Sequence, residues 1–288
     1  MLAIYKRELK SYFQSMIGCV FIAFLVAFAG IYFMAYNLNA GYPYFSYTLS
    51  GVLIVFLVGI PLITMKSFSE ERRNKTDQLL LTAPVSLRQV VMGKYLAMVS
   101  VLAVPNLILC LFPLIIKMQG TAYLKVDYIS IVVFFLLGCV YIAIGMFLSS
   151  LTESQIIAFI TTFGVLLVLY LWDGILSFLP SSAISGAVGI IILLTIVAAY
   201  IQQMTGNWFI SGGIELIGIA ACVVTYIVKS SLFENILTKF LGNLALANVF
   251  TDITSNSIVD ISGIVLYLSV IVVFIFLTVQ AIQKRRWS

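Results

Sequence analysis

Long uninterrupted apolar runs constrain this chain more than any other feature of its sequence. Each run has about 20 residues, enough for a helix to cross about 30 Å of hydrocarbon, whereas membrane barrels use alternating strands of about 9–11 residues. Of the 288 residues, 62% are hydrophobic and 9% are charged, against about 25% charged in soluble domains. The sequence therefore predicts an all-α integral membrane protein, a polytopic helical bundle. The candidate spans are residues 16–36, 46–65, 95–116, 128–149, 155–179, 184–204, 208–228 and 262–282.

The sixth and seventh runs are the least regular. A polar break at residues 202–207 separates them, and Gly212, Gly213 and Glu215 interrupt the start of the seventh run. If both runs cross, the bundle has about eight transmembrane helices, a six-span core plus an extra hairpin. If they do not, they form a re-entrant hairpin beside six spans.

The distribution of lysine and arginine predicts the orientation, because basic residues in short loops stay in the cytoplasm. With the N-terminus inside, twelve cations lie on the cytoplasmic side and four on the outer side, which together are the sixteen of the sequence. An even number of spans then brings the C-terminus back to the cytoplasm. The net charge of +5 fits this topology and anionic lipid heads, and it indicates no nucleic-acid partner. The twelve cytoplasmic cations are Lys6, Arg7, Lys10, Lys66, Arg72, Arg73, Lys75, Arg88, Lys94, Lys284, Arg285 and Arg286.

Residues 1–15 predict an interfacial helix. At 100° per residue, Lys6, Arg7 and Lys10 lie on a face of their own, apart from the apolar residues. We expect the apolar face at the headgroup boundary and the cations at the inner leaflet. The alternative is that these residues only anchor the first span. The apolar face comprises Leu2, Tyr5, Leu9, Tyr12, Phe13 and Met16.

Residues 66–88 form the longest charged connection on the cytoplasmic side. A run of charges, residues 70–73, precedes a short helix signal that begins at Thr76 and ends before Pro84. The leucines at 79–81 either mark a contact with another protein or pack back against the spans. Capping-box spacings then predict defined helix starts, at Ser86 with Gln89 and again at Thr152 with Gln155.

The sequence lacks the groups that most enzymes use. It has no histidine, and its cysteines lie singly in separate apolar runs, which suits packing better than metal binding. No Gly-x-x-x-x-Gly-Lys-Ser/Thr loop is present, so the chain cannot hold a nucleoside triphosphate in the usual way. We therefore expect no catalytic residue, no metal and no cofactor bound by this chain. The cysteines are Cys19, Cys110, Cys139 and Cys222.

Two acids fall within apolar runs, where a charge is costly and often functional. Asp173 lies beside Trp172 near the end of its run, where the outer interface is expected. Glu215 lies about 10 Å into the seventh run at 1.5 Å per residue. It has either a functional or helix-pairing role or a wet, re-entrant position.

Three separated segments resemble one family. They are residues 68–73 with 76–85, residues 148–156, and residues 267–287. In this order they are similar to permeases of the second, export-type class of ATP-binding-cassette (ABC) transporters, and in particular to the gliding-motility-permease-like subfamily. The chain departs from that pattern at two positions. It has Lys75 where the family often has a small Gly, and it has Gln78 near a position where the family often has an acid.

The resemblance implies one transmembrane permease domain over residues 1–288. Within it, residues 1–15 would be the elbow helix, residues 66–88 the coupling loop, and residues 232–258 an outer-side amphipathic or re-entrant segment. The part from Glu70 to Leu81 would dock on a separate ABC ATPase subunit that holds ATP and Mg. The expected contact residues are Glu70, Glu71, Arg72, Arg73, Thr76, Leu79 and Leu80.

The function implied by the resemblance is ATP-driven export through the plasma membrane, in a bacterium. Expected partners are the ATPase subunit, a second copy or a homologous permease, membrane lipids and an outer-side accessory protein. The alternative is a membrane anchor that transports nothing and transmits force to an outer-side protein. The sequence does not identify a substrate.

Overall fold

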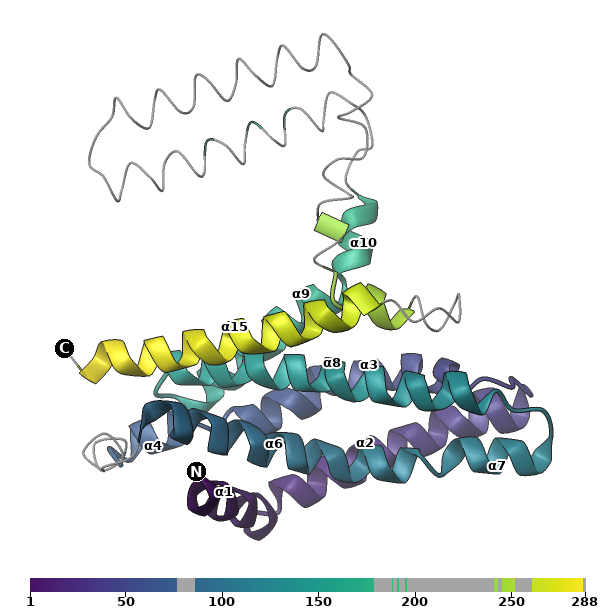
Figure 1. Ribbon diagram of the computed structural model, residues 1–288, viewed down its shortest axis with the longest axis horizontal. Helices are drawn as coiled ribbons and strands as arrows, with labels where there is room; N and C mark the ends of the chain where they lie inside the picture. Colours follow the sequence, from purple (N-terminus) through teal and green to yellow (C-terminus); the bar gives the residue numbers. More distant parts are fainter. Residues whose placement is uncertain are drawn as a thin grey trace. The chain divides into compact units, whose positions relative to one another are not determined.

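The structure, a computed structural model, describes residues 1–76, 86–178, 241–242, 245–251 and 261–286, with the single positions 188, 191 and 195. The chain divides into two compact units, Met1–Tyr170 with Leu246–Ser288, and Leu171–Ala245. Apart from positions 188, 191 and 195, the expected sixth and seventh spans lie outside the described residues, as do Glu215 and most of residues 232–258. In the described part all regular elements are helices (Figure 1), as the sequence predicts.

The first unit contains most of the described helices. Five stretches are long and apolar enough to cross a membrane: Ile17–Asn39, Ser46–Arg73, Leu87–Gln119, Leu124–Leu151 and Ile261–Lys284. A sixth apolar helix, α9, is shorter, with 16 residues. The protein is thus a multi-pass helical membrane protein. Its helices in this unit are α1 (Leu2–Gln14), α2 (Ile17–Phe33), the π-helix η1 (Met34–Asn39), α3 (Ser46–Thr64), α4 (Ser69–Arg73), α6 (Leu87–Leu109), α7 (Phe112–Gln119), α8 (Leu124–Leu151), α9 (Gln155–Tyr170) and α15 (Ile261–Arg286).

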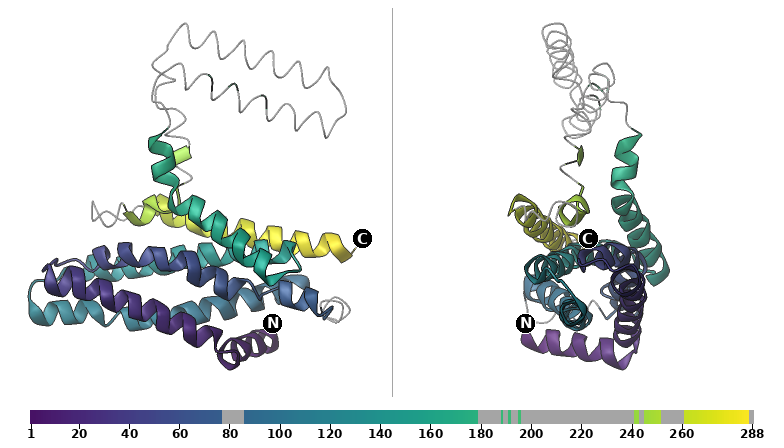
Figure 2. Two further views of the ribbon diagram at one scale, coloured as in Figure 1. Left: turned by 180° about the vertical axis from the view of Figure 1, so that it is seen from behind. Right: turned by 90° about the vertical axis from the view of Figure 1, so that its right-hand side faces the viewer.

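Successive long helices of this unit run in opposite directions. As a result, α1, α4, the start of α6 and the end of α15 lie at the same end of the unit (Figures 1 and 2). We call this the basic end, because most lysines and arginines of the described residues belong to it, whereas Lys117 and Lys125 flank α7 and α8 at the opposite end. This grouping agrees with the partition of cations that the sequence predicts. The cations of the basic end are Lys6, Arg7, Lys10, Lys66, Arg72, Arg73, Lys75, Arg88, Lys94 and Lys284.

Helix α8 is the centre of the bundle and packs against α3, α6, α9 and α15. The rings of Phe56 on α3 and Phe134 on α8 stack at 4.5 Å between centroids. Gly145 marks the closest approach of α8 to its neighbours. A Cβ atom at this position would lie 2.5 Å from Thr64 Oγ1 of α3 and 3.0 Å from Thr162 Cγ2 of α9. Only glycine therefore lets α3, α8 and α9 meet this closely near the basic end.

Helix α1 lies crosswise to the long helices (Figure 2). Its expected apolar face divides in two. Tyr12 is buried and Tyr5 and Leu9 are half-buried against the bundle, whereas Leu2 and Phe13 stay exposed. The division arises because α1 packs on α2 and α6, which leaves only part of its circumference free for lipid.

The second unit is described over a short stretch only. One residue, Leu171, separates the end of α9 from helix α10 (Trp172–Ser177). Trp172 Nε1 donates a hydrogen bond to the Leu241 carbonyl at 2.9 Å. Asp173 lies in the first turn of α10 and is exposed. The position of this acid at the outer interface stays a prediction of the sequence.

Candidate coupling site at the basic end

The short helix α4 is fixed at its start by a single hydroxyl of α8. Ser149 Oγ accepts the backbone N–H groups of Phe68 and Ser69, at 3.3 and 3.4 Å, and donates to the Met65 carbonyl at 3.2 Å. Ser149 and Ser69 are both fully buried. The first two segments on which the family resemblance rests, around residues 68 and 149, thus meet in space.

Arg72 connects α4 to the next helix pair. Its side chain is buried, and Nη1 donates to the Thr152 carbonyl at 3.5 Å, at the point where α8 ends. Because Thr152 lies between α8 and α9, this bond joins α4 to both. Arg72 is one of the expected ATPase contacts, and in the structure its guanidinium bonds within the permease.

Four charged side chains form an ion cluster between α1, α4 and α6. Lys94 Nζ lies 2.9 Å from Glu71 Oε1 and 3.4 Å from Glu8 Oε1, and Arg7 Nη2 lies 3.2 and 2.7 Å from the same two oxygens. Lys94 also donates to the Ser67 carbonyl at 2.8 Å and sits 5.1 Å from the Phe68 ring centroid. The cluster balances two positive charges against two negative ones.

Burial distinguishes the members of this cluster. The Lys94 side chain is 3% exposed, and those of Glu8 and Glu71 are 14% and 18% exposed, whereas Arg7 is 58% exposed. An ion pair with a nearly buried member is costly to break, because removing one partner leaves a buried charge without compensation. Lys94 is therefore the central residue of the cluster, and Arg7 closes it from the solvent side.

The pKa values of neighbouring groups reflect the same charges. Hydrogen bonding to Glu8 is the main cause that raises the pKa of Arg7 above its ordinary value, against partial burial, which lowers it. Burial raises the pKa of the Tyr12 phenol, and the negative charges of Glu8, Glu70 and Glu71 add to that rise. Glu70 thus lies near α1. The Tyr12 hydroxyl donates to the Ile63 carbonyl at 3.1 Å, which adds a second tie between α1 and the end of α3.

The end of α4 has the hydrogen bonds of a Schellman motif. The N–H of Thr76 donates to the Glu71 carbonyl at 2.9 Å, and the N–H of Lys75 donates to the Arg72 carbonyl at 3.0 Å. Lys75 takes the left-handed position of this motif, with φ 55°. Glycine is favoured there, because a side chain in this conformation costs about 1–2 kcal/mol. The family resemblance places a small Gly at this position, and the backbone explains that preference.

The expected contact residues separate into two groups. Arg73, Lys75 and Thr76 are exposed, whereas Glu71 and Arg72 take part in the internal contacts described above. The Thr76 hydroxyl donates to the Glu71 carbonyl at 3.2 Å, so within the described residues it completes the end of α4. Leu79 and Leu80, and the helix expected after Thr76, lie outside the described residues.

Neither predicted capping box forms as the sequence suggests. Helix α6 begins after Ser86, as expected, but the Ser86 side chain makes no capping bond. Helix α9 begins at Gln155, and the Ser154 carbonyl accepts the first helical N–H, from Ala158 at 3.0 Å. Thr152 therefore ends α8 instead of capping α9, because α8 extends two residues further than its apolar run.

Sequence reasoning gave no role to Glu8, Lys94 or Ser149. For Lys94 the sequence does contain a signal. It is a cation within the long helix that contains the third apolar run, and a charged residue in such a place usually has a partner. Glu8 and Ser149 had none, because pairing across three helices is a property of the fold.

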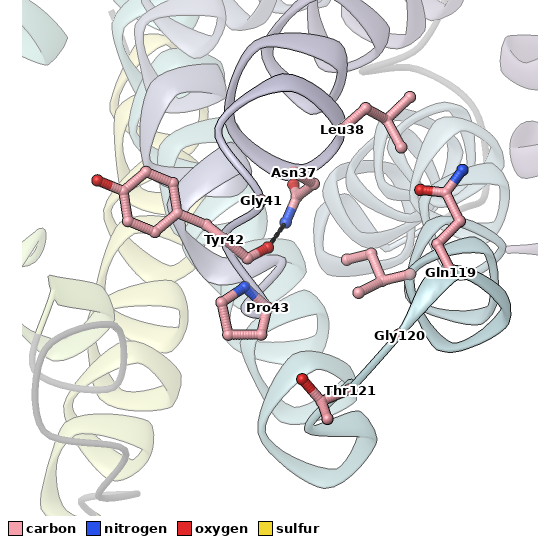
Figure 3. A pocket seen from close by; sticks show the side chains of 9 residues that line it. Asn37, Leu38, Gly41, Tyr42, Pro43, Gln119, Gly120 and Thr121 are labelled. Carbon is pink, nitrogen blue, oxygen red and sulfur yellow. Dashed lines mark hydrogen bonds between the residues drawn. The ribbon is translucent and has the colours of Figure 1, made fainter.

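A small pocket of about 280 Å³ lies at the opposite end of this unit, between the α2–α3 and α7–α8 connections (Figure 3). Asn37 is already satisfied there: its Nδ2 donates to the Tyr42 and Tyr44 carbonyls, and its Oδ1 accepts from Thr48. No charged residue lines the pocket, and the described residues contain no cluster of metal ligands. The pocket offers no chemistry for catalysis. It is lined by Asn37, Leu38, Gly41, Tyr42, Pro43, Ile116, Gln119, Gly120 and Thr121.

A family model, that of the ABC-2 family transporter proteins, matches residues 48–206, more than half of the chain. The chain therefore belongs to the ABC-2 transporter family. The matched range includes α4, Lys94 and Ser149. Membership makes the protein a permease subunit, the membrane-spanning and non-catalytic component of an ABC transporter, and implies an ABC ATPase as its partner. A comparison with curated proteins gives no match.

Proposed function

We propose that this permease belongs to an ATP-driven exporter and that α4, with residues 66–88, receives the work of the ATPase subunit on the cytoplasmic side. The ATPase itself binds ATP and Mg. The gliding-motility-permease-like subfamily remains the prediction of the sequence resemblance. One observation carries the proposal: α4 is tied to α1, α6 and α8 by buried polar contacts, which is what a force-bearing element needs.

These contacts determine which helices would move if α4 were displaced. Ser149 connects it to α8, Lys94 to α6, and Arg72 to the α8–α9 connection. Because packed helices rearrange between discrete packings and do not deform continuously, a push on α4 would move these helices together. The substrate path would lie between two permease copies or homologues, and its opening would follow from that movement.

The test separates binding of the ATPase from coupling to it. Ser149→Ala removes the hydroxyl that fixes α4, and Lys94→Met removes the central cation. The control is Thr161→Ala on the exposed face of α9, whose hydroxyl bonds only its own helix. In liposomes with the cognate ATPase subunit, both test variants should keep the complex but lose most of the permease-dependent stimulation of ATP hydrolysis.

Unchanged stimulation in a well-folded Ser149→Ala, Lys94→Met double variant would contradict the proposal. The same vesicles also distinguish export from force transmission. Substrate-stimulated hydrolysis accompanied by flux supports export, whereas hydrolysis that responds only to an outer-side protein contradicts export and supports the anchor interpretation.

A further inference from the structure

Helix α8 carries a buried polar side chain near each end, and each one binds the backbone of a neighbouring segment. At the basic end, Ser149 holds the start of α4, as described above. At the opposite end, Asp127 Oδ1 accepts the backbone N–H of Phe45, the residue before α3, at 2.8 Å. All three residues are fully buried. Asp127 and Ser149 are 22 residues apart, about 33 Å at 1.5 Å per residue, which is close to the hydrocarbon thickness of about 30 Å.

Between these two residues α8 packs closely on its neighbours. It has the largest buried share of the five candidate spans. At mid-length, a Cβ atom at Gly138 would lie 2.6 Å from Leu102 Cδ2 of α6 and 3.3 Å from Phe56 Cζ of α3. Nearer the basic end, Gly145 makes the close approach to α3 and α9 described above. Close-packed interiors have low compressibility and transmit strain, so a displacement at one end of α8 should arrive at the other.

The α2–α3 connection, residues 40–45, is bonded mostly to its own helix pair. Asn37 of η1 donates to two of its carbonyls. Among the hydrogen bonds of the described residues, the one from the Phe45 N–H to Asp127 joins this connection to α8. The ring of Tyr44 also stacks on that of Tyr123, the residue before α8, at 4.6 Å between centroids. Asp127 thus links α8 to the connection as Ser149 links α8 to α4.

Asp127 is a costly residue for holding one backbone N–H. Its second oxygen, Oδ2, is buried and has no hydrogen-bond partner in the described part of the chain. A buried polar group without a partner costs free energy, so its presence calls for an explanation. Asp127 lies in the first turn of α8 and bonds the start of α3, which places its carboxyl group at the positive ends of two helices. The side chain is suited to joining these two helices.

We infer that α8 carries a displacement of α4 across the membrane and that Asp127 is the positioning residue that passes it to the α2–α3 connection. This inference rests on the proposed function and extends it to the opposite end of the bundle. A push on α4 reaches α8 at Ser149, and the start of α3 follows Asp127. The pocket beside this connection (Figure 3) would then change shape with the nucleotide state of the ATPase.

The experiment follows both ends of the bundle at once. In a background without the four native cysteines, Lys75→Cys reports on the basic end and Tyr42→Cys reports on the α2–α3 connection. Both positions are exposed. The complex with the cognate ATPase subunit is placed in nanodiscs, and the rate of maleimide reaction is measured at each cysteine without ATP and with ATP under conditions that prevent hydrolysis. In the wild-type background, ATP should change the rate at both positions.

Variants at Asp127 separate the two reporters. Asp127→Ala removes the acceptor, so it should keep ATPase binding and the response at position 75 but lose the response at position 42. Asp127→Asn keeps an acceptor oxygen for the Phe45 N–H and should restore the response at position 42. The last variant is a rescue that a general loss of stability would not explain.

The matched control is Ser130→Ala on the same helix. It removes a buried hydroxyl that donates to the Val126 carbonyl of α8 itself, so it should leave both responses unchanged. If Asp127→Ala does not fold, Asp127→Ser takes its place. Its hydroxyl is too short to reach α3 but can bond the Tyr123 carbonyl one turn earlier, as Ser130 bonds Val126.

Three results would overturn the inference and leave the proposed function standing. The first is a folded Asp127→Ala or Asp127→Ser variant that keeps the response at position 42, which would make Asp127 a purely structural residue. The second is loss of the response at both positions in that variant, which a general loss of structure produces. The third is a wild-type complex that responds at position 75 and not at position 42. An intact wild-type complex without a response at position 75 would instead overturn the proposed function.

Discussion

At the scale of single residues, the basic end owes its structure to pairs that the sequence does not show. The sequence places Lys94 correctly among the cations of one side, but its contacts with Glu8 and Glu71 depend on how α1 and α4 pack on α6. Likewise, the preference for a small residue at position 75 is visible in the family resemblance, while its cause is the left-handed backbone at the end of α4. Residue types are readable from sequence, and partners across helices are not.

Lys94→Met should destabilise the protein by about 3 kcal/mol, because it leaves Glu8 and Glu71 facing a site from which their cation has gone. The measurement is thermal or denaturant unfolding in detergent, with Lys10→Met on the exposed side of α1 as the matched control. In a double-mutant cycle with Glu71→Gln, the two changes should show a coupling of about 1–3 kcal/mol. Strictly additive effects would argue against a direct pair.

Lys75→Gly should stabilise the protein by about 1 kcal/mol relative to Lys75→Ala, since both changes remove the charge and only glycine favours the left-handed backbone. The comparison uses melting temperatures of the purified variants. If alanine and glycine are equally stable at this position, α4 does not end in the Schellman motif described above.

At the scale of elements, the sequence predicts spans better than helix ends. The second apolar run, 46–65, matches α3 to within one residue, and the last, 262–282, lies within α15, which continues four residues further. The third, 95–116, begins eight residues after the first residue of α6, because the helix extends into the polar region beyond the apolar run. The Ser86–Gln89 spacing, and not the apolar run, predicts that start. The fifth, 155–179, divides into α9 and α10 at Leu171, a break that no residue type in the run announces.

Gly145→Ala should cost about 1–3 kcal/mol, because the added carbon meets Thr64 of α3 and Thr162 of α9 at once. Gly164→Ala on α9 is the matched control, since a Cβ there meets nothing within 4 Å and helix propensity favours alanine by about 1 kcal/mol. Opposite signs in an unfolding measurement are expected. A neutral Gly145→Ala would show that α3, α8 and α9 do not approach as closely as the structure shows.

At the scale of the whole molecule, composition alone predicts a multi-pass membrane protein, and the family match identifies it as an ABC-2 permease. The orientation predicted from charge depends on the basic end facing the cytoplasm. The grouping of α1, α4, the start of α6 and the end of α15 at one end fits that orientation (Figure 1).

In a background without the four native cysteines, a cysteine replacing Lys75 should react with a membrane-impermeant maleimide only after cells are permeabilised. A cysteine replacing Thr121, exposed between α7 and α8 at the opposite end, should react in intact cells. The reverse pattern would place α4 outside the cell and remove the basis for coupling.

The most direct test of the central claim, that α4 delivers the work of the ATPase to the bundle, is site-specific photo-crosslinking in the assembled complex. A photoreactive amino acid at position 75 should form an adduct with the ATPase subunit, in a yield that changes when ATP is bound, whereas the same residue at position 121 should form none. An active complex that gives no adduct from position 75, or an equal adduct from position 121, would contradict the account.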